Sequence, residues 1–153
     1  MQIGDEIPIY KWENDTENWE FGDTKTPFTK EEIIDFVNNS QNLKVNTQLR
    51  LMVCLKDNTT IGCVDFFEFD EQNNSAGVGI LIGEKEYRKH GYANQALSLL
   101  KANAKDEYQL TKLFCNIAPD NKTSIRLFEK NGFELIQNKE LFGKQVNYYE
   151  IIL

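Results

Sequence analysis

The sequence is poor in the features that identify several classes of protein. Its 153 residues include only three cysteines, Cys54, Cys63 and Cys115, and this odd number shows no paired spacing. No run approaches the ~20 apolar residues that cross a bilayer. The first residues lack the basic stretch and apolar run of a secretory signal. We therefore expect reduced, buried thiols, no membrane span and a cytoplasmic location.

The sequence also lacks an excess of positive charge and a cluster of metal ligands. It has 24 acidic and 17 basic residues, a net charge of −7, and a single histidine. Nucleic acids and anionic membranes attract proteins of the opposite charge, and no group of His, Cys or Asp has the spacing of a metal site. We expect no nucleic-acid partner, no membrane partner and no metal, whereas the acidic balance is compatible with a cationic small substrate.

Apolar and aromatic residues are sufficient for one hydrophobic core. Hydrophobic residues make up 41% of the chain, with ten Phe, six Tyr and two Trp, which excludes disorder as the main state. No internal repeat, low-complexity tract or Pro/Gly/Ser linker divides the sequence. We predict a single domain over residues 1–153.

The first half of the chain predicts helices followed by three antiparallel strands. A capping box of Thr29 and Glu32, supported by a hydrophobic staple of Phe28 and Ile33, starts a helix. β-rich segments separated by polar turns then predict the strands. In chain order the elements are Tyr10–Asp15 and Lys30–Asn38 as helices, and Leu49–Leu55, Thr60–Asp70 and Ala76–Ile82 as strands.

The second half alternates helices and strands. One apolar stripe predicts a helix from Gly91 to about Lys105; it consists of Ala93, Ala96, Leu97, Leu100 and Ala104. A later helix is capped by Asp120 or Asn121, and Gly132 suits its left-handed end. The remaining elements are a strand at Leu113–Ala118, the capped helix at Ser124–Asn131, and strands around Phe133–Gln137 and Asn147–Leu153. This order is typical of an α+β or mixed α/β domain.

The segment Gly79–Ala93 is the strongest candidate for a binding site. A strand ends at Ile82, a polar loop follows, and a helix begins near Gly91. The first turn of a helix leaves about four amides without partners at the positive end of its dipole. Glycine permits close approach, and Arg88 and Lys89 add charge, so the loop fits a phosphate or pyrophosphate. From these residues alone, a plain connection in which the glycine only makes a turn fits equally well.

Two motifs in this half resemble one known family. Arg88–Ala93 (R-x-x-G-x-A) resembles the acyl-CoA pyrophosphate motif of the GCN5-related N-acetyltransferases (GNATs). About thirty residues on, Asn121–Phe133 resembles the family's N-x-x-(A/S)-x-x-L-Y-E-K-x-G-F helix. Further segments are similar to the subgroup containing spermidine and ribosomal-protein acetyltransferases; they are Tyr10–Asp15, Thr26–Thr29, Ile61–Gly62 and Tyr148–Tyr149.

The resemblance implies a fold and a co-substrate. The fold is a mostly antiparallel sheet of about six to seven strands flanked by about four helices. The sheet is splayed between the Ala76–Ile82 and Leu113–Ala118 strands. The co-substrate is acetyl-CoA, whose implied contacts are Ile80, Leu81, Ile82, Arg88, Lys89, His90, Gly91, Tyr92, Ala93, Asn121 and Phe128. Asn121 serves equally well as a simple helix cap. Family members also begin with a strand, for which Met1–Ile7 leaves little room.

Three positions depart from the family at places where its members carry proton-transfer groups. Phe128 stands where many members have a tyrosine acid, Asn116 where some have a glutamate base, and Gly77 where ribosomal-type members have glutamate. Our hypothesis is that Asn116 is catalytic and orients a water, with Asp65 or Glu68 as distant proton acceptors. Both carboxylates are better explained as solvated strand residues.

The resemblance implies an N-acetyltransferase that acts on a primary amine, either of a polyamine-like small molecule or of a peptide or protein. The alternative is a non-catalytic acyl-CoA-binding module with a degenerate active site. His90, the single histidine, is better explained as a loop residue near phosphate than as a general base. The sequence is also compatible with a homodimer.

Overall fold

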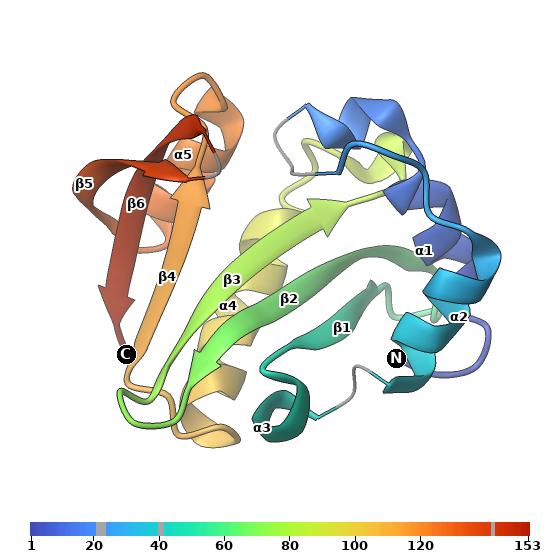
Figure 1. Ribbon diagram of the computed structural model, residues 1–153, viewed down its shortest axis with the longest axis horizontal. Helices are drawn as coiled ribbons and strands as arrows, with labels where there is room; N and C mark the ends of the chain where they lie inside the picture. Colours follow the sequence, from blue (N-terminus) through green and yellow to red (C-terminus); the bar gives the residue numbers. More distant parts are fainter. Residues whose placement is uncertain (21–23, 40–41, 142) are drawn as a thin grey trace.

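The computed structural model describes residues 1–20, 24–39, 42–141 and 143–153. Helices precede three consecutive strands, and in the second half of the chain helices alternate with strands until two strands end it (Figure 1). The elements are α1 (Glu6–Glu13), η1 (Thr16–Trp19), α2 (Lys30–Asn39), α3 (Leu43–Asn46), β1 (Leu49–Cys54), β2 (Thr60–Asp70), β3 (Ser75–Ile82), η2 (Lys85–Tyr87), α4 (Tyr92–Asp106), β4 (Lys112–Ile117), α5 (Lys122–Lys130), β5 (Glu134–Leu141) and β6 (Lys144–Ile152).

The six described strands form one sheet in the order β1-β2-β3-β4-β6-β5. Every neighbouring pair is antiparallel except β3 and β4, which run parallel. Figure 1 shows α4 behind β2 and β3, while α1 and α2 lie together beyond β1. The predicted mixed, mostly antiparallel α+β architecture is therefore confirmed, with six strands and five α-helices in the described residues.

The main core lies between the sheet and α4. The apolar stripe predicted for this helix is buried, because Leu97, Leu100 and Ala104 pack with Phe66 of β2 and Leu113 of β4. Burying one such leucine stabilises the fold by about 1.5–3 kcal/mol. A smaller cluster of Ile9, Ile33 and Val37 joins α1 and α2 to Met52 of β1. This apolar packing holds the two N-terminal helices against the sheet.

Two helix ends that the sequence predicted are confirmed, and both are marked by a local capping motif. The Thr29 amide donates to Glu32 Oε2 at 2.7 Å, and the Glu32 amide donates to Thr29 Oγ1 at 3.2 Å, so the capping box is formed. At the other end of the chain, Gly132 has a φ of 89° and ends α5 as predicted. Both capping motifs involve residues only a few positions apart, so they can be recognised in the sequence.

Elements without such a signature differ from the prediction. In the described part of the chain no strand precedes α1, which begins at Glu6 rather than Tyr10. The one-turn helix α3, capped by Asn42, was not expected. Strands β5 and β6 extend to a tight hairpin in which Leu141 pairs with Lys144. Their tips are polar and mostly exposed, so no alternation of apolar residues marks them.

The close approach of β2 to β3 predicts that Gly62→Ala destabilises the fold. A Cβ at Gly62 would lie 2.1 Å from the carbonyl oxygen of Leu81, a backbone atom that cannot move aside. We expect a loss of at least about 1–3 kcal/mol in the free energy of unfolding, measured by urea denaturation. Gly79→Ala is the matched control, since its nearest heavy atoms lie at 3.9 Å. Equal stability of the two variants would contradict this packing.

Candidate functional site

The parallel strands β3 and β4 are joined over only three residue pairs. The pairs run from Ser75↔Lys112 to Gly77↔Phe114. Beyond them, β3 continues against β2 alone and β4 against β6 alone, so the two strands diverge as Figure 1 shows. Among the described residues, main-chain groups on the inner edges of the diverging strands have no strand partner there, and they can bind an extended chain that carries amides.

Aromatic side chains fill the point at which the sheet divides. The rings of Phe67 and Phe114 meet edge to face at 5.8 Å. A Cβ at Gly77 would lie 2.3 Å from the Phe67 ring, so the position at which ribosomal-type members carry glutamate has no room for a side chain in this packing. A carboxylate at position 77 would require the Phe67 ring to move.

The loop between β3 and α4 presents free backbone amides. Lys89 and Gly91 both have positive φ, 65° and 86°, and Gly91 caps α4 without a side chain. Among the described residues no acceptor meets the amides of residues 89–94, whereas the flanking amides of Arg88 and Gln95 donate to the carbonyls of Lys85 and Gly91. With the dipole of α4 behind them, these amides form a cradle for an anion (residues 89–94, the anion cradle).

Arg88 does not direct its charge into the anion cradle. Its Nε donates to the Ile82 carbonyl at 2.8 Å, and its Nη2 donates to Asn18 Oδ1 at 3.1 Å. The guanidinium thus fastens the loop to the end of β3 and to η1, and the role of Arg88 as a cofactor contact stays a prediction. The exposed Lys89 carries the cationic charge beside the amides.

Two other expected cofactor contacts have different surroundings from those predicted. Phe128 is 3% exposed and packs edge to face on Phe133 at 4.9 Å, so its ring belongs to the core. Asn121 Oδ1 accepts a hydrogen bond from the Ser124 amide at 3.1 Å and caps α5. Asn121 therefore acts as the helix cap in the structure, and its contact with the cofactor stays a prediction.

The remaining expected contacts lie along one path. Ile80 and Leu81 are half-buried on β3, where it has left β4, and Ile82 is buried at its end. The anion cradle follows directly, with Tyr92 and Ala93 half-buried in the first turn of α4. The residues that the structure brings together are Ile80, Leu81, Ile82, Lys89, His90, Gly91, Tyr92 and Ala93. Their contact with a ligand stays a prediction.

Asn116 lies on the opposite wall of the divided sheet. It is two positions beyond Phe114, the last residue of β4 that pairs with β3, and it pairs with Tyr148 of β6. Its Oδ1 is buried and has no hydrogen-bond partner among the described residues. An unsatisfied buried acceptor costs about 1–3 kcal/mol, so this atom is suited to a donor that a ligand supplies.

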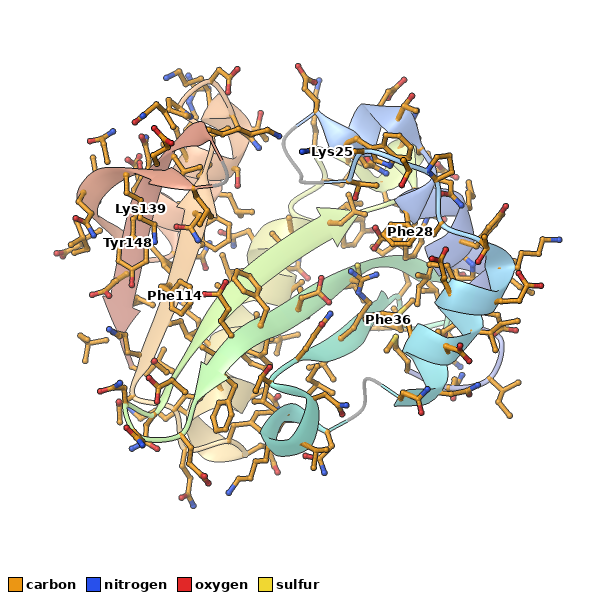
Figure 2. The ribbon with its side chains drawn as sticks, viewed as in Figure 1. Lys25, Phe28, Phe36, Phe114, Lys139 and Tyr148 are labelled. Carbon is orange, nitrogen blue, oxygen red and sulfur yellow. The ribbon has the colours of Figure 1, made fainter. Side chains whose placement is uncertain are left out.

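Tyr148 and its neighbours form a polar network on the face of the sheet opposite α4 (Figure 2). The Tyr148 hydroxyl donates to Glu150 Oε1 at 2.6 Å, and Lys112 Nζ bonds the same carboxylate at 3.0 Å. Lys139 Nζ lies 4.0 Å above the Tyr148 ring, and the Phe114 ring is 5.7 Å away. Burial, together with the Glu150 bond, raises the pKa of Tyr148. Only the resemblance of the C-terminal segment pointed to this residue in the sequence.

The two carboxylates proposed as proton acceptors differ in their partners. Asp65 accepts hydrogen bonds from Nε and Nη2 of Arg50 at 2.7 and 3.0 Å, and Arg50 also donates a hydrogen bond to Glu13. Glu68 is exposed at a bulge in β2, with a φ of 48°, and has no ion pair or hydrogen bond among the described residues. Its charge contributes to the raised pKa of Tyr148. Of the two carboxylates, Glu68 is the one without a partner among the described residues.

The cysteines offer no nucleophile near this site. Cys63 and Cys115 are buried, and burial raises the pKa of the Cys63 thiol to about 12. The expectation of a buried thiol is wrong for Cys54, which is exposed at the end of β1 beyond a shift in register. In the described ranges there is no group of three or more His, Cys, Asp or Glu residues that could hold a metal ion, and no helix is long and apolar enough to cross a membrane.

Known proteins resemble the chain in sequence and in fold. Residues 1–134 match the family model described as Acetyltransferase (GNAT) domain. Over 88 residues the chain is 27% identical to alpha/beta-tubulin-N-acetyltransferase 9 of Mus musculus. These residues cover 57% of this chain and 36% of that protein. The match thus spans about a third of the length of the curated relative.

Two solved structures share the fold over nearly the whole chain. Spermidine N-acetyltransferase from Vibrio cholerae, in complex with CoA and spermine, has a TM-score of 0.89 at 20% identity and matches 99% of this chain and 92% of its own. Aminoglycoside acetyltransferase AAC(6')-Ib, in complex with coenzyme A, has a TM-score of 0.83 at 17% identity, over 99% of this chain and 91% of its own.

The bonds of Arg88 predict that Arg88→Gln destabilises the protein while Lys89→Gln does not. Loss of the guanidinium leaves the Ile82 carbonyl and the Asn18 amide oxygen without their charged donor, at a cost of about 1–3 kcal/mol. The Lys89 side chain is exposed, so its replacement should change stability by less than about 0.5 kcal/mol. Urea denaturation of both variants measures the difference. Equal stabilities would show that Arg88 does not hold the loop.

Proposed function

Because the chain belongs to the acetyltransferase (GNAT) domain family, we propose that it transfers an acetyl group from acetyl-CoA to a primary amine. The observation that carries the proposal is the position of the anion cradle. Its free amides follow directly on the stretch of β3 that has left β4. One continuous path thus leads from an anion site to the divided sheet, which suits a ligand with a diphosphate at one end and an amide-bearing arm at the other.

The residues along this path fit coenzyme A. The amides of residues 89–94 and the Lys89 ammonium can bind the diphosphate, because a helix N-terminus favours negative charge. Inner-edge main-chain groups of β3 near Ile80 and Ile82 can bond the amides of the pantetheine arm. Acetyl-CoA supplies the activated thioester when bound; everything else in the reaction depends on groups of the chain and of the acceptor.

Transfer requires a neutral amine at the thioester carbon. As the C–N bond forms and the C–S bond breaks, the amine loses a proton and the thiolate leaves. An ammonium with a pKa near ~10.4 loses its proton at pH 7 at a cost of about 4.6 kcal/mol. We propose that Asn116 Oδ1, buried and without a partner, accepts a hydrogen bond from the amine. Glu68, the carboxylate without a partner, accepts the proton through water.

The charge and shape of the face opposite α4 favour a cationic acceptor. The Phe114 and Tyr148 rings lie together there, and aromatic faces attract ammonium groups, as Lys139 above Tyr148 illustrates. The negative charge of Glu68 also acts on Tyr148, where it contributes to the raised pKa of the hydroxyl. We therefore propose an acceptor of the polyamine class or a peptide with a free amine. Spermine and CoA in the Vibrio cholerae structure support this choice. A cytoplasmic, homodimeric enzyme stays our expectation.

We predict release of CoA thiol from acetyl-CoA when the protein is mixed with spermidine, spermine or a peptide with a free α-amine. Thiol release is followed with a disulfide reagent, and CoA binding by thermal shift. Because the acceptor must be neutral, kcat/KM for spermidine and spermine should rise between pH 7 and pH 9, approaching tenfold per pH unit, whereas for an α-amine with a pKa near ~7.8 it should level off above about pH 8. A thermal shift without thiol release for any acceptor would establish the non-catalytic module instead. No thermal shift with CoA would overturn the cofactor assignment.

Glu68→Gln and Asn116→Ala are predicted to lower kcat while the KM for acetyl-CoA stays unchanged. For Glu68→Gln the loss should be on the order of 10²-fold, the lower range of general base catalysis, and it should diminish at high pH, where the amine is neutral without help. Glu134→Gln, an exposed carboxylate on β5, is the matched control. Full activity of Glu68→Gln would exclude the base, and full activity of Asn116→Ala with unchanged CoA affinity would exclude the amide.

A further inference from the structure

A cavity of about 630 Å³ follows the outer edge of β1. The strand is first in the sheet order and pairs with β2 only. Five consecutive residues, 51–55, line the cavity, although neighbouring side chains of a strand point to opposite faces of the sheet. The cavity therefore runs along the strand edge itself, where alternate amides and carbonyls of β1 point outward.

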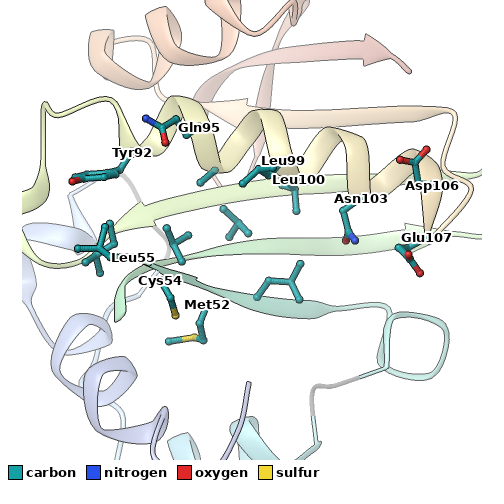
Figure 3. Close-up of a pocket in the computed structure, with 15 residues that line it drawn as sticks. Met52, Cys54, Leu55, Tyr92, Gln95, Leu99, Leu100, Asn103, Asp106 and Glu107 are labelled. Carbon is teal, nitrogen blue, oxygen red and sulfur yellow. The ribbon is translucent and has the colours of Figure 1, made fainter. Parts of the chain in front are cut away.

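The second wall of this cavity is one side of α4 (Figure 3). Leu99 lies there with 71% of its surface exposed, next to the buried Leu100. Across from them, Leu51 and Val53 are only partly buried. We call this space the β1–α4 groove; it combines an apolar floor with an open strand edge. An open, apolar strand edge is a template for pairing with another chain.

The far end of the β1–α4 groove is polar and negatively charged. Asn103, Asp106 and Glu107 of the last turns of α4 and its end line it. Asn103 Oδ1 is buried and has no hydrogen-bond partner in the described part of the chain, and the same part offers no ion pair to Asp106 or Glu107. This end is thus complementary to a hydrogen-bond donor with positive charge.

We propose that the β1–α4 groove binds an extended segment of a partner protein, which adds to the edge of β1 as a further strand. Alternate apolar side chains of the segment pack against Leu51, Val53 and Leu99, and a lysine or arginine at one end meets Asp106 and Glu107. Main-chain hydrogen bonds contribute the affinity of such strand addition, and the alternating side chains contribute its specificity.

The charges of β1 argue against a second copy of the chain as the occupant. If two copies paired through β1, each would bring the residues 49–54 to the other's groove. The single cation in that stretch is Arg50, whose guanidinium is already bonded by Asp65 and Glu13. Within this stretch no cation is free to meet Asp106 and Glu107, whereas a foreign segment can supply one directly from its paired residues.

The test is fluorescence anisotropy with synthetic nine-residue peptides that have blocked ends. In them valine alternates with threonine, and two lysines stand at the N-terminal or the C-terminal end. We expect saturable binding of one peptide. Leu99→Glu should weaken it at least about tenfold, equivalent to about 1.4 kcal/mol, and N-methylation of alternate peptide amides should abolish it. Ile152→Glu, which replaces an equally exposed apolar residue on β6 (74% exposed), is the matched control and should bind as the wild type does.

A second pair of variants tests the charged end. Asp106→Asn combined with Glu107→Gln should weaken the lysine peptide but not a peptide with glutamine in place of lysine. Thermal unfolding verifies that each variant is folded. The proposal is overturned if neither lysine peptide binds, or if Leu99→Glu leaves binding unchanged. It is also overturned if the wild type sediments as a dimer that Leu99→Glu dissociates, since a second copy would then occupy the groove. Acetyl transfer should be the same in all groove variants, which separates this test from that of the proposed function.

Discussion

The short pairing between β3 and β4 is the constraint on which the site depends. Three residue pairs join the two parts of the sheet, and the pairing stops at Gly77 and Phe114. Both strands remain held beyond that point, because β2 pairs with β3 and β6 pairs with β4. The Phe67 and Phe114 rings pack at the division. In the described residues, the main-chain groups at the inner edges therefore stay available to a ligand.

The anion cradle keeps its donors free for a related reason. Ordinary helix starts satisfy their amides with a Ser, Thr, Asp or Asn cap, but α4 starts at Gly91, which has no side chain to offer. Arg88 compensates for the loop's lack of internal bonds by anchoring it to Ile82 and Asn18. One cation is used for structure and Lys89 is left for the ligand, so a chain with a net charge of −7 can still present a locally positive site.

The residues available for proton transfer are where this chain differs most from the family pattern. The three positions where the family's members carry such groups are filled here by Phe128, Asn116 and Gly77, and two of the three serve packing. Asn116 is different because its oxygen is buried without a partner. Glu68 becomes available through a bulge of β2, where its positive φ turns it out of the regular ladder. The sequence pattern of β2 does not reveal this bulge or the positive φ of Glu68.

The sequence by itself determined the features that depend on neighbours a few positions apart. These are the capping box of α2, the buried stripe of α4 and the glycine that ends α5, since spacing within one helix decides which side chains meet. Tertiary structure alone decided which polar groups are free. Arg88 turns to Asn18, 70 positions away, Asp65 is bonded by Arg50 from the adjacent strand, and Cys54 is exposed at the sheet edge. The reason is physical: whether a charge or an amide has a partner depends on atoms that the fold brings from distant parts of the chain, and no local pattern records them.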